Sequence, residues 1–226
     1  MTAFVAAQYP PGSRRGWVAF ARWTASWLYR VPYRLHVHGT DNTPPTGALV
    51  VVVNHSTFAE GPLVLGAVPR RAVFLIKREL FVGPIGWMLR GMGQLAINRD
   101  APDRAPLLEA QRILRAGGVI GIFPEGTRGE GQMAVAQNGA AWLATSTGAT
   151  VLPVACRGTY RAPGTPRRFR PRVDILVGKP LTLPNQRGRA AVTAAPEQIR
   201  VALADLVVEL DEARGARSSI SNGESE

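Results

Sequence analysis

Cysteine and histidine are scarce in this sequence. Its 226 residues include one cysteine, Cys156, and three histidines, His36, His38 and His55. A single thiol excludes a disulfide within the chain and any zinc site built from several cysteines, and it suits a reducing compartment. With so few histidines, one that directly follows a strand, as His55 does, is a candidate for chemistry.

Long hydrophobic runs are also absent. No apolar stretch approaches the roughly 18–20 residues that a transmembrane helix needs. The opening MTAFVAAQYPPGSRRG places its arginines after the apolar residues, whereas a signal peptide has its positive charges first. We therefore expect a protein that stays inside the cell, either soluble or lying on a membrane. In such a protein the sequon Asn54-His55-Ser56 is not a glycosylation site.

Acidic residues are few, with 16 Asp and Glu against 27 Lys and Arg, which gives a net charge of +11. This excess predicts a polyanionic partner: a nucleic acid, an anionic membrane surface or a phosphorylated substrate. Nucleic acid is disfavoured because no helix-turn-helix, zinc or RNA-binding signature is present. Part of the charge falls in one stretch containing Arg157, Arg161, Arg167, Arg168, Arg170 and Arg172. That stretch either meets the phosphates of lipid head groups or of a bound ligand, or is an ordinary solvated surface.

Residues 13–30 form a candidate membrane-interface helix. On a helical projection, Arg15, Arg22 and Arg30 share a narrow polar face, and the broad remainder is apolar. The tryptophans of that apolar side are Trp17, Trp23 and Trp27. A helix of this composition is typical of the plane of an anionic bilayer surface, although it could also dock on the protein's own core. We assign residues 1–33 to this N-terminal lead and helix.

Predicted strands and helices alternate through the rest of the chain. Apolar runs predict strands at 33–39, 47–53, 71–76, 94–99, 118–123, 150–156 and 172–178. Helical periodicity and stop signals predict helices at 61–68, 103–118, 137–148 and 195–214, and a Gly-rich apolar helix or elbow at 83–93. This alternation predicts an α/β fold whose mixed, largely parallel sheet is flanked by helices, in one domain over 34–214. Residues 215–226 are polar, and we expect them to be disordered.

The stretch VVVVNHSTFAE ends a buried strand with a histidine and then a carboxylate, His55 and Glu60. Five residues of regular helix would leave the two side chains about 140° apart. They can meet only if His55 lies in the turn before a helix and Glu60 in its first turn. Glu60 could then accept the imidazole N–H, leaving the other nitrogen to take a proton from a hydroxyl. Alternatively, His55 caps the helix and Glu60 interacts with its dipole.

Two further features follow predicted strands, and a third lies within one. IFPEGTRGEG combines turn-forming glycines with Arg128, whose planar guanidinium suits a phosphate. Its place after a strand is where α/β proteins tend to bind ligands. GQLAINR puts Arg99 after another strand, and in VLPVA Pro153 indicates a sheet edge or bulge. Each feature alone is a weak signal.

In this order and at these separations, NHSTFAE, GQLAINR, FPEGTRG and VLPVA resemble the four sequence blocks of the PlsC-type 1-acylglycerol-3-phosphate acyltransferase family. The resemblance covers about residues 34 to 210 and implies the glycerol-3-phosphate acyltransferase-like αβ fold. It implies transfer of a fatty acyl group from acyl-CoA or acyl-carrier protein to a lysophospholipid hydroxyl in phospholipid biosynthesis. The expected acceptor is 1-acyl-sn-glycerol-3-phosphate, giving phosphatidic acid. Alternatives are another lysophospholipid or phosphoglycolipid acceptor, or a non-catalytic membrane-binding relative.

The resemblance also assigns roles to residues. His55 would be the general base and Glu60 its orienting partner, with no cofactor, metal ion or nucleic acid involved. Arg99 and Arg128 would bind the acceptor's phosphate. The pocket around them would be shaped by Glu125, Gly126 and Thr127. The expected location is peripheral or monotopic, on the cytoplasmic face of the cell membrane.

Two positions depart from the family pattern. Glu60 stands where most members have aspartate, so its carboxylate is one methylene further from the backbone. Ala96 replaces a bulky apolar residue in the second block. Because the resemblance implies no acyl-enzyme, we expect Cys156, inside a predicted strand, to be a core residue.

Overall fold

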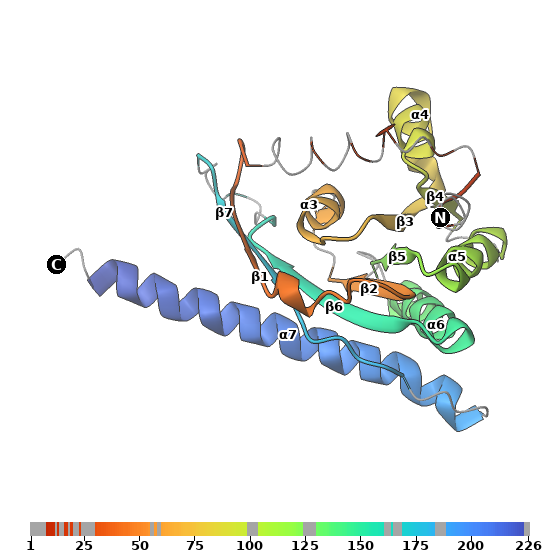
Figure 1. The fold of residues 1–226 in the computed structure, drawn as a ribbon. Helices are drawn as coiled ribbons and strands as arrows, with labels where there is room; N and C mark the ends of the chain where they lie inside the picture. The colour runs from red at the N-terminus through yellow and green to blue at the C-terminus, as the bar shows by residue number, and fades with distance from the viewer. Residues whose placement is uncertain are drawn as a thin grey trace.

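The computed structural model describes the chain at residues 8–11, 13, 16, 17, 19, 23, 30–54, 57, 60–98, 104–123, 130–160, 164, 169–183 and 189–223. Within this part, a single sheet of seven strands forms the centre of the molecule (Figure 1). The strands are β1 (Arg34–His38), β2 (Leu49–Val53), β3 (Ala72–Lys77), β4 (Leu95–Ile97), β5 (Val119–Ile122), β6 (Thr150–Arg157) and β7 (Arg172–Val177).

The sheet has the strand order β1-β7-β6-β2-β5-β3-β4. Strands β6, β2, β5, β3 and β4 run parallel to one another. At the other end, β7 pairs antiparallel with β6 and parallel with β1. The prediction of a mixed, largely parallel sheet is therefore confirmed.

Helices cover both faces of the sheet (Figure 1). The helical elements are η1 (Thr40–Asn42), α3 (Glu60–Ala67), η2 (Arg78–Leu80), α4 (Gly83–Gly91), α5 (Ala105–Arg115), α6 (Glu130–Thr147) and α7 (Arg189–Gly223). Helices α5, α6 and α7 share one hydrophobic cluster with the sheet, and α3 contributes to a second cluster on the opposite face. None of the described helices is both long and apolar enough to cross a bilayer.

The burial of β2 on both faces of the sheet explains why its sequence is an unbroken apolar run. Its side chains alternate between the two clusters, with Val50 and Val52 in one and Leu49, Val51 and Val53 in the other. All five residues are completely buried. A strand with helices on both faces needs apolar residues at every position, whereas a strand with one solvated face alternates.

Helix α7 is longer than the sequence pattern indicates. It starts at Arg189, contains Pro196 and continues to Gly223. An internal proline removes a helical hydrogen bond, but Ile199, Leu203 and Leu210 are buried along this helix and stabilise it. The structure differs here from the expected disordered tail, because residues 215–223 continue the helix. No proline interrupts them, and one internal glycine costs only about 1 kcal/mol.

Helix α6 also begins earlier than predicted, at Glu130 instead of residue 137.

In the neighbouring strand, the edge position suggested for Pro153 is wrong, because β6 lies between β7 and β2. The other suggestion, a bulge at Pro153, agrees with the strand pairing. Strand β6 pairs Val154 with Val177, but the isolated bridge pairs Val151 with Leu181, so the register shifts by one residue around Pro153.

Candidate functional site

The predicted site residues follow the carboxyl ends of parallel strands. Strands β2, β4, β5 and β6 point the same way, so their carboxyl ends share one edge of the sheet. Glu60 begins α3, directly after β2, and lies in the described part of the chain. The other predicted site residues lie outside the described residues: His55, Arg99, Glu125, Gly126, Thr127 and Arg128.

The carboxyl end of β2 is fixed by the side chain of Asn54, which is buried. Its Nδ2 donates to the carbonyl oxygen of Cys156 at 2.9 Å, and its Oδ1 accepts from the Cys156 backbone N–H at 2.6 Å. The amide side chain thus pairs with the β6 backbone as another strand residue would. It continues the β2–β6 ladder to the residue immediately before His55.

The carboxylate of Glu60 lies in the first turn of α3, as predicted, and its residue is completely buried. The hydroxyl of Thr159 donates a hydrogen bond to its Oε1 at 2.7 Å. The Glu60 backbone N–H donates to the Thr57 carbonyl at 3.3 Å. A buried carboxylate is unfavourable unless donors satisfy it, so the hydrogen bond from the Thr159 hydroxyl stabilises the Glu60 side chain in this position.

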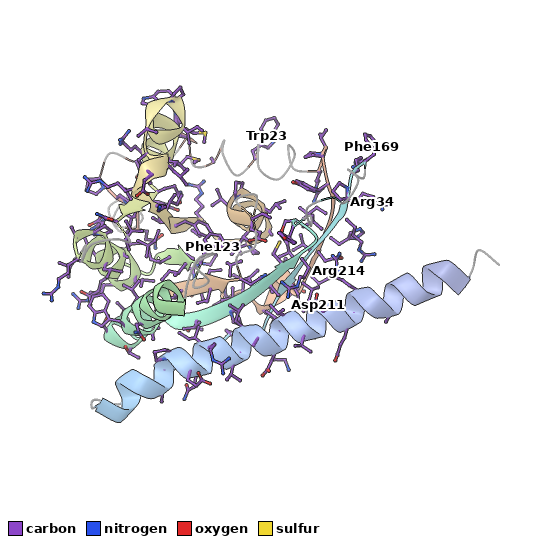
Figure 2. All side chains as sticks on the ribbon, turned by 180° about the vertical axis from the view of Figure 1, so that it is seen from behind. Trp23, Arg34, Phe123, Phe169, Asp211 and Arg214 are labelled. Atoms are coloured by element: carbon purple, nitrogen blue, oxygen red, sulfur yellow. The ribbon has the colours of Figure 1, made fainter. Side chains whose placement is uncertain are left out.

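Aromatic packing brings the first and third sequence blocks together. Phe123 opens the third block, and a Cβ placed on Gly61 would lie 3.9 Å from its ring. The Phe123 ring also stacks on Phe74 at a centroid distance of 5.5 Å (Phe123 is labelled in Figure 2). Gly121 makes room for Phe74, because a Cβ at this position would lie 2.3 Å from that ring. The end of β5 is thereby held against the start of α3.

The second block is connected to this packing through Gln94. Its side-chain Oε1 accepts a hydrogen bond of 2.8 Å from the backbone N–H of Phe74. Its Nε2 donates to the Met92 carbonyl at 3.3 Å. Because Phe74 stacks on Phe123, the second block supports the ring that lies beside Gly61. The fourth block is connected through β6, whose continuation supplies Thr159.

Cys156 is a buried core residue of β6, as the sequence predicts. Burial raises the pKa of its thiol to about 12, and the negative charge of Glu60 contributes to the increase. Such a thiol remains protonated at neutral pH, and the thiol form is a poor nucleophile. The local environment therefore disfavours covalent catalysis by Cys156.

The arginine-rich stretch only partly fits a ligand-binding surface. Arg157 Nε donates to Asp211 Oδ1 at 2.9 Å, and Arg172 Nη2 donates to Asp174 Oδ1 at 2.8 Å. The buried Asp174 also pairs with Arg214 of α7. Figure 2 labels Asp211 and Arg214 on this helix. Arg157 and Arg172 thus form ion pairs with carboxylates of the chain itself.

The remaining arginines of that stretch are described only in part. Arg170 donates from Nη2 to the Arg30 carbonyl at 2.7 Å. The other three, Arg161, Arg167 and Arg168, lie outside the described residues.

Among the residues that are described, no group of three or more His, Cys, Asp or Glu side chains could hold a metal ion.

Sequence reasoning did not assign a role to Asn54 or Thr159. Asn54 carried a signal, since it lies within the first block beside His55. Thr159 carried none, because it contacts Glu60 across 99 residues of sequence. Only the pairing of β2 with β6 and the turn after β6 bring Thr159 and Glu60 together.

Comparison with known proteins agrees with these blocks. Residues 34–157, more than half of the chain, match the Acyltransferase family model. The chain is 26% identical to the 1-acyl-sn-glycerol-3-phosphate acyltransferase of Bacillus subtilis, over 72% of this chain and 84% of that protein. It is 30% identical to the enzyme of the same name from Borreliella burgdorferi, over 58% of this chain and 54% of that protein.

A solved structure has the same fold. The crystal structure of the 1-acyl-sn-glycerophosphate acyltransferase PlsC from Thermotoga maritima superimposes with a TM-score of 0.65 and 26% sequence identity. The match covers 86% of this chain and 79% of that one. The chain therefore belongs to the acyltransferase family, in its PlsC-type group.

Proposed function

We propose that the protein transfers a fatty acyl group from a thioester, acyl-CoA or acyl-carrier protein, to the free hydroxyl of 1-acyl-sn-glycerol-3-phosphate, producing phosphatidic acid. The single observation that carries this proposal is the buried carboxylate of Glu60. It begins a helix at the carboxyl edge of a parallel sheet, five residues after His55. The names of the relatives from Bacillus and Borreliella give the acceptor class.

In the proposed reaction, His55 removes the proton from the acceptor hydroxyl as its oxygen attacks the thioester carbonyl carbon. The C–S bond then breaks, and the departing sulfur takes up the proton, so the products are the new ester and a free thiol. Glu60 orients the imidazole and stabilises its positive charge while the proton is held. Arg99 and Arg128 bind the acceptor phosphate, and Glu125, Gly126 and Thr127 shape its pocket.

A thiol-release assay tests this proposal directly. Purified protein is incubated with palmitoyl- or oleoyl-CoA and a panel of lysophospholipids, and the acylated product is identified by mass. His55→Ala should lower the rate by about 10²–10⁴-fold, the usual loss for a general base. Glu60→Asp should remain active and Glu60→Gln should lose activity, since the carboxylate charge supports the imidazole.

Two results would contradict the proposal. His55→Ala with a rate within a few fold of wild type would remove the base from the mechanism. No thiol release with any acceptor, from a folded wild-type protein that still binds vesicles, would favour a non-catalytic membrane-binding relative.

Neutralising Arg99 or Arg128 should raise KM for the acceptor well above any change in KM for the thioester. A change confined to the thioester would reverse the assignment of these arginines.

The proposed location is the cytoplasmic face of the membrane, held peripherally by an anionic lipid surface. Support comes from α4, where Trp87 and the neighbouring Val82 and Ile85 are 60%, 68% and 54% exposed. The Trp17 ring contacts Trp87 edge-on at a centroid distance of 4.4 Å, so Trp17 packs beside this helix. Figure 2 shows Trp23 on the side of the molecule opposite α7. Exposed tryptophan beside arginine favours the bilayer interface.

Vesicle binding tests this location separately from activity. Trp23→Ser combined with Trp87→Ser should weaken co-sedimentation with phosphatidylglycerol vesicles, even at low salt, because apolar area is lost. Trp142→Ser is the matched control, since this tryptophan of α6 is also exposed, at 41%, but belongs to a different helix. High salt should weaken wild-type binding only in part. If the double variant sediments as well as wild type, these tryptophans do not contact lipid.

A further inference from the structure

We infer that Thr159 is a positioning residue for the reaction: its hydroxyl fixes the orientation of the Glu60 carboxylate. This inference rests on the proposed function, in which Glu60 orients the imidazole of His55. It adds a residue from outside the four sequence blocks, and it makes the turn after β6 part of the catalytic apparatus. Thr159 touches no reacting atom in this scheme and acts through Glu60.

The contact is suited to this role. Thr159 Oγ1 lies 2.7 Å from Glu60 Oε1, and the carboxylate can only accept, so the hydroxyl is the donor. The final torsion of a glutamate side chain has broad, roughly two-fold preferences, so rotamer energy alone does not fix the plane of its oxygens. A hydrogen bond to one oxygen selects that plane. Because Glu60 is completely buried, solvent does not offer an alternative donor there.

The turn that carries Thr159 is fixed by the backbone. Gly158 has a φ of 94°, a conformation that disfavours other residues. A Cβ at this position would also lie 2.1 Å from the Arg172 carbonyl oxygen of β7. The chain therefore leaves β6 pressed against β7 and turns at a glycine, and this places the next side chain at Glu60.

Both ends of the segment from Asn54 to Glu60 are held by the same stretch of β6 and its turn. Asn54 pairs with the backbone of Cys156, and Glu60 accepts from Thr159, three residues further along. Thr159 thus restrains the helix end of the segment, as Asn54 restrains its strand end. Rigid support of this kind is how a catalytic pair keeps its geometry without paying ordering entropy at each turnover.

A hydroxyl that merely satisfied a buried carboxylate would matter for folding but not specifically for catalysis. Three variants separate the two roles. Thr159→Val keeps the shape and removes the donor, Thr159→Ser keeps the donor, and Thr159→Cys offers a weak donor of similar size. The Glu60→Ala background removes the group that Thr159 is inferred to position.

The experiment measures kcat, KM for both substrates and Tm for each variant. Thr159→Val should lower kcat by about 10- to 100-fold, the range found when the hydrogen-bond partners of metal ligands are removed, with both KM values nearly unchanged. Thr159→Ser should restore most of the rate. In the Glu60→Ala background, Thr159→Val should cause little further loss, because interacting residues are not additive. If Thr159→Val does not fold, Thr159→Cys should give the intermediate rate of a weak donor.

The inference is overturned if Thr159→Val, or Thr159→Cys in its place, keeps the wild-type kcat. It is also overturned if the loss is as large in the Glu60→Ala background, since the hydroxyl would then act independently of Glu60. Failure of the proposed function looks different: His55→Ala would then retain activity. If His55→Ala is inactive and Thr159→Val is fully active, only the role of Thr159 is wrong.

Discussion

Replacing Asn54 with alanine is expected to destabilise the fold far more than the loss of an ordinary polar side chain. The Asn54 amide makes two hydrogen bonds to the Cys156 backbone, and both residues are buried. Asn54→Ala leaves a buried N–H and a buried carbonyl without these partners, at about 1–3 kcal/mol each. The expected loss is therefore about 2–6 kcal/mol in the free energy of unfolding, a large part of the usual 5–15 kcal/mol.

Thermal and urea unfolding, followed by circular dichroism, measure this loss. For a domain of this size, 1 kcal/mol corresponds to about 2–4 °C of Tm, so Tm should fall by about 4–24 °C. Asn42→Ala is the matched control, because Asn42 donates a single partly buried hydrogen bond to the Val177 carbonyl at 2.9 Å. That variant should lose only about 0.5–1.5 kcal/mol. An Asn54→Ala protein no less stable than Asn42→Ala would refute the reasoning.

Two further predictions concern buried ionisable groups. The Cys156 thiol, whose pKa burial raises to about 12, holds its proton at a pH where the unfolded chain has lost it. The unfolded state therefore binds fewer protons than the folded state above about pH 8.5, so the free energy of unfolding falls as the pH rises. Between pH 8 and 10 this fall should be about 2 kcal/mol larger in wild type than in Cys156→Ala. The free energy of unfolding is measured by urea unfolding at several pH values. If it falls equally with pH in wild type and in Cys156→Ala, this prediction is wrong. Asp174→Asn should lower Tm, because the buried carboxylate pairs with Arg172 and Arg214. An unchanged Tm would show that these pairs do not stabilise the docking of α7.

The sequence predicts the strands and most helices because buried positions need apolar residues, and the spacing of these residues differs between strands and helices. The unbroken apolar run of β2 requires helices on both faces, and the structure has them. Helix ends are harder to predict, because they depend on packing that local signals do not contain. Pro196 suggests a helix start, but the buried Ile199, Leu203 and Leu210 stabilise a helix that begins at Arg189.

The strand order could not be predicted from the pattern. Nothing in the local sequence of β7 indicates that it runs antiparallel to β6 and pairs with β1, the first strand of the chain. The same limit applies to the arginine-rich stretch. Arg157 looks like a surface charge in the sequence, and its acidic partner Asp211 becomes visible only once α7 lies against β6. Arg214 of α7 likewise reaches Asp174 of β7 across 40 residues of sequence.

The candidate site follows the same division between local and long-range information. Glu60 was predictable, because a carboxylate in the first turn after a buried strand is a local pattern, and the structure places it there. Its hydrogen bond with Thr159 depends on parallel pairing of β2 with β6 and on a turn that requires Gly158. Strand pairing brings together two segments 99 residues apart, and both ends of the segment from Asn54 to Glu60 are held by β6 and the turn that follows it. Mutations that loosen the end of β6 should therefore affect catalysis and stability together, although none of its residues belongs to the proposed acid–base pair.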